Sequence, residues 1–581
     1  MKNMLFHRAS KSALLLGTVL AVLAVFSCTK DFDSINSNPN GYTADKVEPS
    51  FQLANVFGNS VLDPGMHERM HQLTNDIFAQ FFANEGFSTQ TGKTNDEWAT
   101  SYYNDYHSRF IANLNDVIRN ERKKGVDSRE LHVARIWRCW VYSRATDMYG
   151  DLPYFGAADG TGQNAPYDKQ SDIYKDMLKE LKEASAALND DMKPMPAGQD
   201  YVYNNDVAKW KKFANSLRLR LALRCSQADP ALAKTNAEEA IAAGVFGSAD
   251  DACNMPRSDQ FGWGYNYQNS YYYGWGSLAM SRSMENLMTG LGGQPFPSKA
   301  GVTYTFDDPG IAIPGGPFEN ALDPGHDKFK LGVPSTVDPR GPLYFEPSST
   351  ASGTSDMILA DGQTYNCLNR WRGTPAGLST TARSKPYYQM SNQARLGKPY
   401  LEVTRPFEVL TYHEVCFLLA EAAQRGWAAG ATTQNWYEKG IEASMLHHGV
   451  SAATITAYTA STAENTYGTT VKWGNDSGKM WNGKSVDGEL DKIITQKYIA
   501  LFPDGGWEAW NDHRRLHRPA LVPFAAPDPT AVSATNGGPG NYVKRITYPS
   551  VEALNNTAFY NQAVSNQGPD VEATPVWWDK D

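Results

Sequence analysis

Apolar side chains recur every three or four residues in two long stretches of this chain, and this spacing constrains the fold more than any other feature. Residues 132–149, 171–189 and 207–224 follow the helical repeat, and so do residues 435–448 and 490–502. Each segment needs a partner for its apolar face, and the short connections between them favour antiparallel neighbours. The sequence therefore predicts a mostly α fold built from helix pairs.

Helix-end signals support these segments. Asp229 followed by Pro230 has the form of an N-cap with proline at the first helical position, and Gly244 can close that helix. Thr411 with Glu414 three residues later forms a capping box. The repeated pairs predict a tetratricopeptide-like array, in which each pair buries its apolar face by stacking on its neighbours, although the strict repeat consensus is absent.

The helical pattern divides the chain into scaffold and loops. The scaffold is predicted at about 63–246 and 405–517, with loop-rich elaborations at about 252–398 and 519–581 that are high in Gly, Pro, Ser, Asn and Asp. We expect both elaborations to dock on the array, so residues 28–581 form a single domain.

The N-terminus has the pattern of a secreted lipoprotein. Lys2, Arg8 and Lys11 precede 14 apolar residues at 13–26, too few to span a bilayer comfortably, and Ser27-Cys28 closes the run. This predicts a signal peptide at 1–27 and lipidation of Cys28, with Phe26 larger than usual for such a motif. An ordinary signal peptide cut nearby, or an uncleaved anchor, remains the alternative. The acidic stretch after Cys28 resembles a signal for export to the cell surface, so we expect an outer-membrane protein that faces the exterior.

Charge and cysteine content exclude several classes. Without its signal peptide the chain carries 51 basic and 63 acidic residues, a formal charge of −12, with no basic tract that would favour nucleic acid. Five cysteines then remain besides Cys28, an odd number without paired spacing. Buried thiols are the prediction; a Cys253–Cys367 disulfide is the alternative.

Aromatic residues gather in one loop. Residues 261–275 hold eight aromatics in fifteen positions, spaced by glycines. Flat rings with a polar edge stack on the C–H faces of sugars, so Trp263, Tyr265, Tyr267, Tyr271, Tyr273 and Trp275 are candidate ligand contacts. Anchoring of the loop to the scaffold, or contact with a protein partner, is the alternative.

Several segments together resemble the SusD/RagB-type nutrient-binding outer-membrane lipoproteins. They are residues 144–154, 167–174, 210–224, 414–427, 496–502 and 508–515, in the family's order and behind a lipoprotein-like signal. The resemblance implies tetratricopeptide-like helix pairs in a right-handed array with an irregular, loop-rich ligand-binding face. It implies a lid on a TonB-dependent, SusC-like transporter that captures oligosaccharides, or peptides in some members, without performing chemistry.

Two further places are candidate ligand contacts. Trp98 and Tyr102 lie between the early helices, where family ligand sites often form, and Arg370 with Trp371 lies in the loop-rich middle. The helical tryptophans are predicted to be core residues: Trp137, Trp140, Trp210 and Trp510.

One motif points to an enzyme. His67, Glu68 and His71 match the H-E-x-x-H pattern of zinc proteases, but the sequence offers no third ligand, and other catalytic fingerprints are absent. We therefore expect a binding protein without catalytic residues, metal or cofactor; a structural calcium ion has no support in the sequence. A zinc hydrolase, a peptide-capture lid and a partner that only stabilises the transporter are the alternatives.

Overall fold

Neighbouring helices make up most of the protein in a computed structural model. It describes residues 47–84, 86–158, 165–257, 278–312, 328–349, 356–358, 362–378, 384–385, 388–402, 404–524 and 542–580. The chain divides into two units, Met1–Glu48 and Pro49–Asp581, and every described helix and strand belongs to the second.

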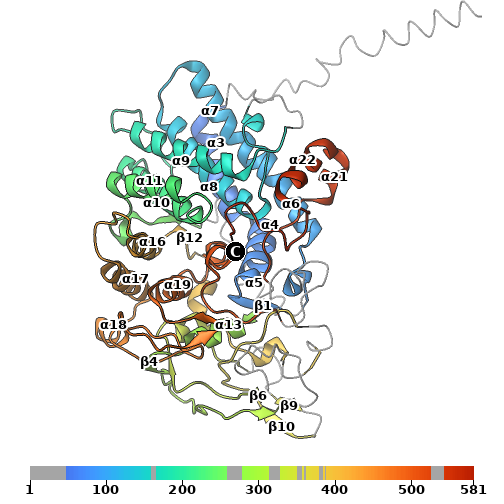
Figure 1. Ribbon diagram of the computed structural model, residues 1–581, viewed down its shortest axis with the longest axis vertical. Helices are drawn as coiled ribbons and strands as arrows, with labels where there is room; N and C mark the ends of the chain where they lie inside the picture. The colour runs from blue at the N-terminus through green and yellow to red at the C-terminus, as the bar shows by residue number, and fades with distance from the viewer. Residues whose placement is uncertain are drawn as a thin grey trace, which may run out of the picture. The chain divides into compact units, whose positions relative to one another are not determined.

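The first group of helices follows the chain order (Figure 1). Its main members are α3 (Pro49–Leu62), α7 (Ala112–Lys124), α8 (Arg129–Tyr149), α9 (Gln170–Ala187), α10 (Val207–Arg224) and α11 (Pro230–Ala243). From α7 to α11 each helix packs against the next, and α3 packs against α7 and α8. Apolar faces are thereby covered by sequence neighbours, as in a helical repeat array.

The second group continues this arrangement. It comprises α16 (Tyr412–Gln424), α17 (Thr433–His447), α18 (Ala452–Thr459), α19 (Glu489–Ala500) and α20 (Gly506–Leu516). Helix α16 packs against α17 and α19, while α10 contacts both α16 and α20 and so joins the two groups. The predicted mostly α fold is confirmed.

The predicted caps by Asp229, Gly244 and Thr411 are confirmed, but the reciprocal half of the capping box does not form, because the Glu414 carboxylate pairs with Arg220. The Asp229 carboxylate accepts from the backbone N–H of Leu232 at 3.1 Å, and Gly244 follows the last residue of α11. The Thr411 hydroxyl accepts from the Glu414 N–H at 3.3 Å at the start of α16. These contacts satisfy backbone donors that the first turn of a helix leaves free.

Strands in the described part of the chain form small antiparallel pairs. The pairs are β1 (Phe82–Asn84) with β3 (Leu278–Met280), β2 (Cys253–Met255) with β12 (Phe407–Leu410), β4 (Thr289–Pro295) with β7 (Thr336–Val337), β5 (Ile311–Ala312) with β6 (Lys328–Phe329), β8 (Phe345–Glu346) with β11 (Arg395–Leu396), β9 (Asp356–Ile358) with β10 (Thr364–Asn366), and β13 (Met480–Trp481) with β14 (Lys484–Ser485). Strands β6, β9 and β10 lie together at the end of Figure 1 opposite α7.

The structure differs from the predicted division into scaffold and loops in two places. The scaffold begins with α3 at Pro49 rather than near residue 63, and α3 buries Leu53, Val56 and Phe57 completely. The C-terminal elaboration contains α21 (Ser550–Asn555) and α22 (Thr557–Gln567). These two helices bury almost no side chains, only Ala563 of α22, so their sequences lack the apolar repeat that reveals the other helices.

Large aromatic residues fill the helical core. Trp137, Trp210 and Trp510 are at most 1% exposed and Trp140 is 3% exposed, as the sequence predicts. The Trp137 indole N–H donates to the Ser60 hydroxyl at 3.0 Å, which links α8 to α3. Cys139, Cys225, Cys253, Cys367 and Cys416 are buried free thiols, so the alternative of a Cys253–Cys367 disulfide is wrong.

Candidate functional site

The H-E-x-x-H motif lies on a π-helical segment, η1 (His67–Asn75). Within it the Thr74 hydroxyl donates to the Arg69 carbonyl at 2.6 Å and the Asn75 amide donates to the Met70 carbonyl, in each case five residues back. These side-chain bonds occupy carbonyls along the turn and accompany the wide π geometry, which often occurs at functional positions.

The two histidines of the motif lie side by side without a metal-binding arrangement. The His67 and His71 rings stack at 5.0 Å and are 3% and 4% exposed. Burial, followed by the nearby His71 and by Arg257, Arg144 and Arg405, holds the pKa of His67 well below its usual value. The described part of the chain contains no group of three or more His, Cys, Asp or Glu side chains placed to hold a metal ion. Such cationic surroundings also oppose a metal cation.

The candidates on α6 (Asp96–Asp105) belong to the packed interior. Asn95 caps this helix by accepting from the Trp98 N–H at 3.1 Å. Trp98 packs against Phe87 at 5.3 Å and is 9% exposed, while Tyr102 is 4% exposed and stacks on Tyr149. Ligand contact by Trp98, at the edge of the core, stays a prediction. Ligand contact by Tyr102 also stays a prediction, but its ring is enclosed by other aromatic side chains, which favours a packing role.

The candidates in the loop-rich middle are used inside the fold. Arg370 is 1% exposed and donates to the backbone carbonyls of Lys330 at 2.6 Å and Asn392 at 3.0 Å. Trp371 is fully buried and its indole N–H donates to the Phe345 carbonyl at 2.7 Å. Both side chains are thus buried and hydrogen-bonded within the fold, and ligand contact by Arg370 and Trp371 stays a prediction that this packing does not favour.

The aromatic loop lies outside the described residues, and so does Cys28. Its ligand contacts, at Trp263, Tyr265, Tyr267, Tyr271, Tyr273 and Trp275, therefore stay predictions. The strands on either side of the loop are paired: β2 precedes the loop and pairs with β12, and β3 follows the loop and pairs with β1. Both strands that flank the loop are thereby anchored to the scaffold.

A network of buried ion pairs joins segments that are distant in sequence. The pairs include Arg220 with Glu414, Arg224 with Asp147 and Glu508, Arg515 with Glu421, and Lys497 with Asp512. Every one of these residues lies in a segment that carries the family resemblance, so those segments are where α8, α10, α16, α19 and α20 are held together. Breaking such a pair leaves a buried charge uncompensated, which is costly.

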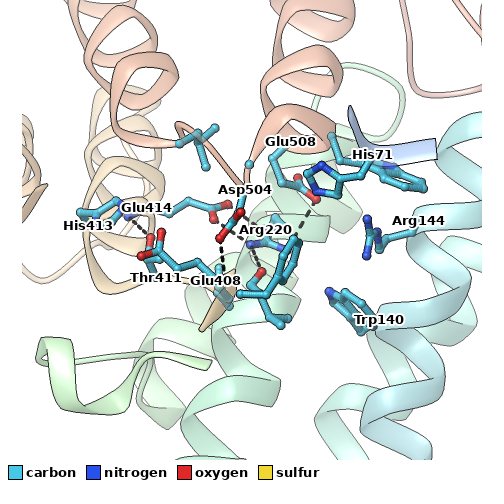
Figure 2. Close-up of a pocket in the computed structure, with 16 residues that line it drawn as sticks. His71, Trp140, Arg144, Arg220, Glu408, Thr411, His413, Glu414, Asp504 and Glu508 are labelled. Carbon is cyan, nitrogen blue, oxygen red and sulfur yellow. Dashed lines mark hydrogen bonds and ion pairs between the residues drawn. The ribbon is translucent and has the colours of Figure 1, made fainter. Parts of the chain in front are cut away.

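A polar pocket opens beside this network (Figure 2). Its walls come from α8, α10, β12, the start of α16 and the start of α20, and His71 of η1 also contributes to the wall. Figure 2 shows Arg144 between Trp140 and His71, facing Arg220 and Glu508 across the pocket. The lining carboxylates are those of Glu408, Glu414, Asp504 and Glu508.

Arg144 differs from the other cations of this region. Its guanidinium carbon lies 3.9 Å from the Trp507 ring centroid and 4.8 Å from that of Trp140. Within the described ranges no hydrogen bond or ion pair reaches this guanidinium. Burial, only partly offset by Tyr102 and Glu508, lowers the pKa of Arg144 to about 10. The sequence prediction missed this pocket, although an arginine four residues after Trp140 on one helix face was a usable signal.

Family models match both halves of the chain. One, described as "Starch-binding associating with outer membrane", matches residues 41–293, and another, described as "Susd and RagB outer membrane lipoprotein", matches residues 336–579. A solved SusD homologue from Parabacteroides distasonis is 31% identical, with 92% of this chain and 98% of that chain covered and a TM-score of 0.78. This chain belongs to the SusD/RagB-like family of outer-membrane lipoproteins.

Other solved structures share the fold of this SusD-like protein. A chitin-binding SusD homologue from Flavobacterium johnsoniae is 25% identical over 92% of this chain and 99% of that chain, with a TM-score of 0.68. A SusD homologue from Bacteroides ovatus is 23% identical over 92% and 99% of the two chains, with a TM-score of 0.67. The search of curated proteins found no match. None of the described helices is long and apolar enough to cross a membrane.

Proposed function

We propose that this SusD-like protein is a lipid-anchored lid that binds oligosaccharide at the cell surface and passes it to a SusC-like, TonB-dependent transporter. Family membership carries the proposal, because the matching models describe outer-membrane lipoproteins and starch binding. A similar solved structure is that of a chitin-binding protein, which supports a glycan as the ligand. Lipidation of Cys28 would supply the anchor.

The aromatic loop supports the same proposal from the chemistry of the chain. Eight aromatic residues lie within residues 261–275, between β2 and β3. Sugar rings bind to such surfaces by stacking, supplemented by a few directional hydrogen bonds. A transporter lid needs no catalytic group, and the buried charges of Arg220, Arg224, Lys497 and Arg515 are engaged in ion pairs rather than arranged around a reacting bond.

Titration calorimetry against a panel of neutral oligosaccharides, including chitin and starch fragments, tests the ligand class. We expect binding of at least one glycan with modest affinity. Binding of peptides without any glycan would replace this proposal by the peptide-capture lid. Co-purification of the tagged protein with a TonB-dependent barrel tests the partner, and a barrel that co-purifies while no ligand binds would favour a purely stabilising role.

A further inference from the structure

The polar pocket of Figure 2 contains hydrogen-bond donors that have no acceptor among the described residues. The Arg144 guanidinium has no hydrogen bond or ion pair among described residues, and the Trp507 indole N–H is buried without a hydrogen-bond acceptor there. Trp507 is 3% exposed, whereas Arg144 is partly exposed. Buried donors without partners carry a large desolvation cost, so such a cluster indicates a bound acceptor.

The carboxylates of the pocket do not fill that role, because each has another cation. Glu414 pairs with Arg220 at 2.7 Å, Asp504 with Arg405 at 2.6 Å, Glu408 with His447 at 2.7 Å, and Glu508 with Arg224. Arg144 is therefore the lining cation whose charge has no direct counterion within the described part of the chain. A charge that has lost part of its hydration is stabilised by an opposite charge beside it, and partial burial lowers the pKa of Arg144.

The surroundings of the Arg144 guanidinium leave it able to bind an anion. The Trp140 and Trp507 rings hold the guanidinium by cation–π contacts, so its donor edges are left to bind a planar group. Helix α20 begins at this wall with Gly506. It has no side-chain N-cap, because the residue before it is Gly505. The buried Asp76 carboxylate already lies against Gly506, so the cation that an anion would meet in this pocket is Arg144.

We propose that this pocket binds a carboxylate or a similar small oxyanion, which pairs with Arg144 and accepts from the Trp507 indole N–H. The anion comes either from the solution or from an acidic sugar; the second source rests on the proposed function. Strand β12 lines the pocket and pairs with β2, which ends at Met255, six residues before Phe261 at the start of the aromatic loop. A glycan that carries a uronic acid would present such a carboxylate.

Calorimetry with the mature lipoprotein in detergent tests this pocket. The probes are glucuronate, glucose and acetate at constant ionic strength. We expect glucuronate and acetate to bind, with glucose failing to compete. Arg144→Met should weaken anion binding at least about tenfold, as expected for loss of a charged hydrogen-bonding partner. Arg144→Lys should weaken it less, because the charge remains while the planar fork is lost.

Two more variants separate the pocket from general effects. Trp507→Phe keeps an aromatic ring beside Arg144 but removes the N–H, so it should weaken anion binding without loss of the fold. Arg122→Met, on the exposed surface of α7, is the matched control and should bind as the native chain does. Should Arg144→Met not fold, Trp507→Phe and Arg144→Lys still decide the question.

The outcomes distinguish the pocket from the proposed function. Arg144-dependent binding of acetate with no preference for glucuronate supports the pocket with a free anion as its occupant. Failure of the native chain to bind either anion, or equal binding by Arg144→Met, overturns the pocket, even where neutral oligosaccharides bind and the proposed function stands. Anion binding through Arg144 without binding of any oligosaccharide would support the pocket and count against the glycan lid.

Discussion

Arg515 of α20 and Glu421 of α16 form a two-pronged ion pair inside the protein. Nη1 of Arg515 donates to Oε1 of Glu421 at 2.6 Å and Nη2 donates to Oε2 at 2.5 Å, with both side chains 1% exposed. Burial by itself would raise the pKa of Glu421, but the Arg515 charge outweighs it and the pKa lies below its usual value. The pair thus holds two scaffold helices together through charges that water does not screen.

Removal of one partner should be strongly destabilising. Arg515→Met leaves the buried Glu421 carboxylate with Asp512 nearby and with Arg425, whose side chain is 21% exposed, as its remaining cation, so we expect the free energy of unfolding to fall by up to about 3–5 kcal/mol in urea denaturation. Lys179→Met removes one side of an exposed pair with Glu183, in which the side chains are 60% and 47% exposed. That control should lose less than about 1 kcal/mol. Equal losses for the two variants would show that the buried pair has no special role.

A close helix contact predicts an effect of a single methyl group. Gly440 of α17 faces the buried ring of Phe417 in α16, and a Cβ atom at position 440 would lie 2.7 Å from Cε1 of that ring. Gly440→Ala should therefore destabilise the protein by about 1–3 kcal/mol through overpacking. Gly65→Ala, where the nearest atom is 3.7 Å away, is the control and should change stability little. Thermal unfolding of both variants measures the difference, and a neutral Gly440→Ala would mean that the two helices separate at no cost.

The pH dependence of stability should report a buried histidine. Burial, followed by the charges of His517 and Lys544, lowers the pKa of His513 to about 3, and this side chain is 3% exposed. In the unfolded chain the histidine binds a proton below about pH 6.5 while the folded protein does not, so stability falls as the pH decreases from there. His513→Gln should flatten this fall by up to about 1.4 kcal/mol per pH unit, measured by urea denaturation between pH 4 and 6.5.

His447 provides a test with the opposite sign. The hydrogen bond that His447 donates to the Glu408 carboxylate, followed by the charge of that carboxylate, raises the pKa of His447. Its contribution to stability is present below about pH 6.5 and is lost as the pH rises through the raised pKa. His447→Gln should therefore weaken the protein at mildly acidic pH and have little effect at alkaline pH. The same direction of change for both histidine variants would contradict the assignment of their surroundings.

The helices could be predicted from sequence where burial and local signals agree. Helix α10 spans Val207–Arg224 as the apolar repeat indicates, and its start is fixed by Asp206, whose carboxylate accepts from the Lys209 N–H at 3.0 Å. The polar pocket could not be predicted in the same way. It depends on which cation remains without a partner after Arg220, Arg224 and their carboxylates have paired, and such pairing over long sequence separations is not a local property.

The aromatic loop yields the last prediction. If Trp263 and Trp275 stack on sugar rings, Trp263→Ala and Trp275→Ala should each lower the affinity for a bound oligosaccharide roughly two- to tenfold, or about 0.5–1.5 kcal/mol, in calorimetry. The fold should be unaffected, because the tryptophans of the described core, such as Trp137, Trp210 and Trp371, lie outside this loop. Phe155→Ala removes an aromatic ring that is 49% exposed outside this loop, and it should leave the affinity unchanged. A loss of affinity confined to Phe155→Ala, or absent from both tryptophan variants, would move the glycan site away from the loop.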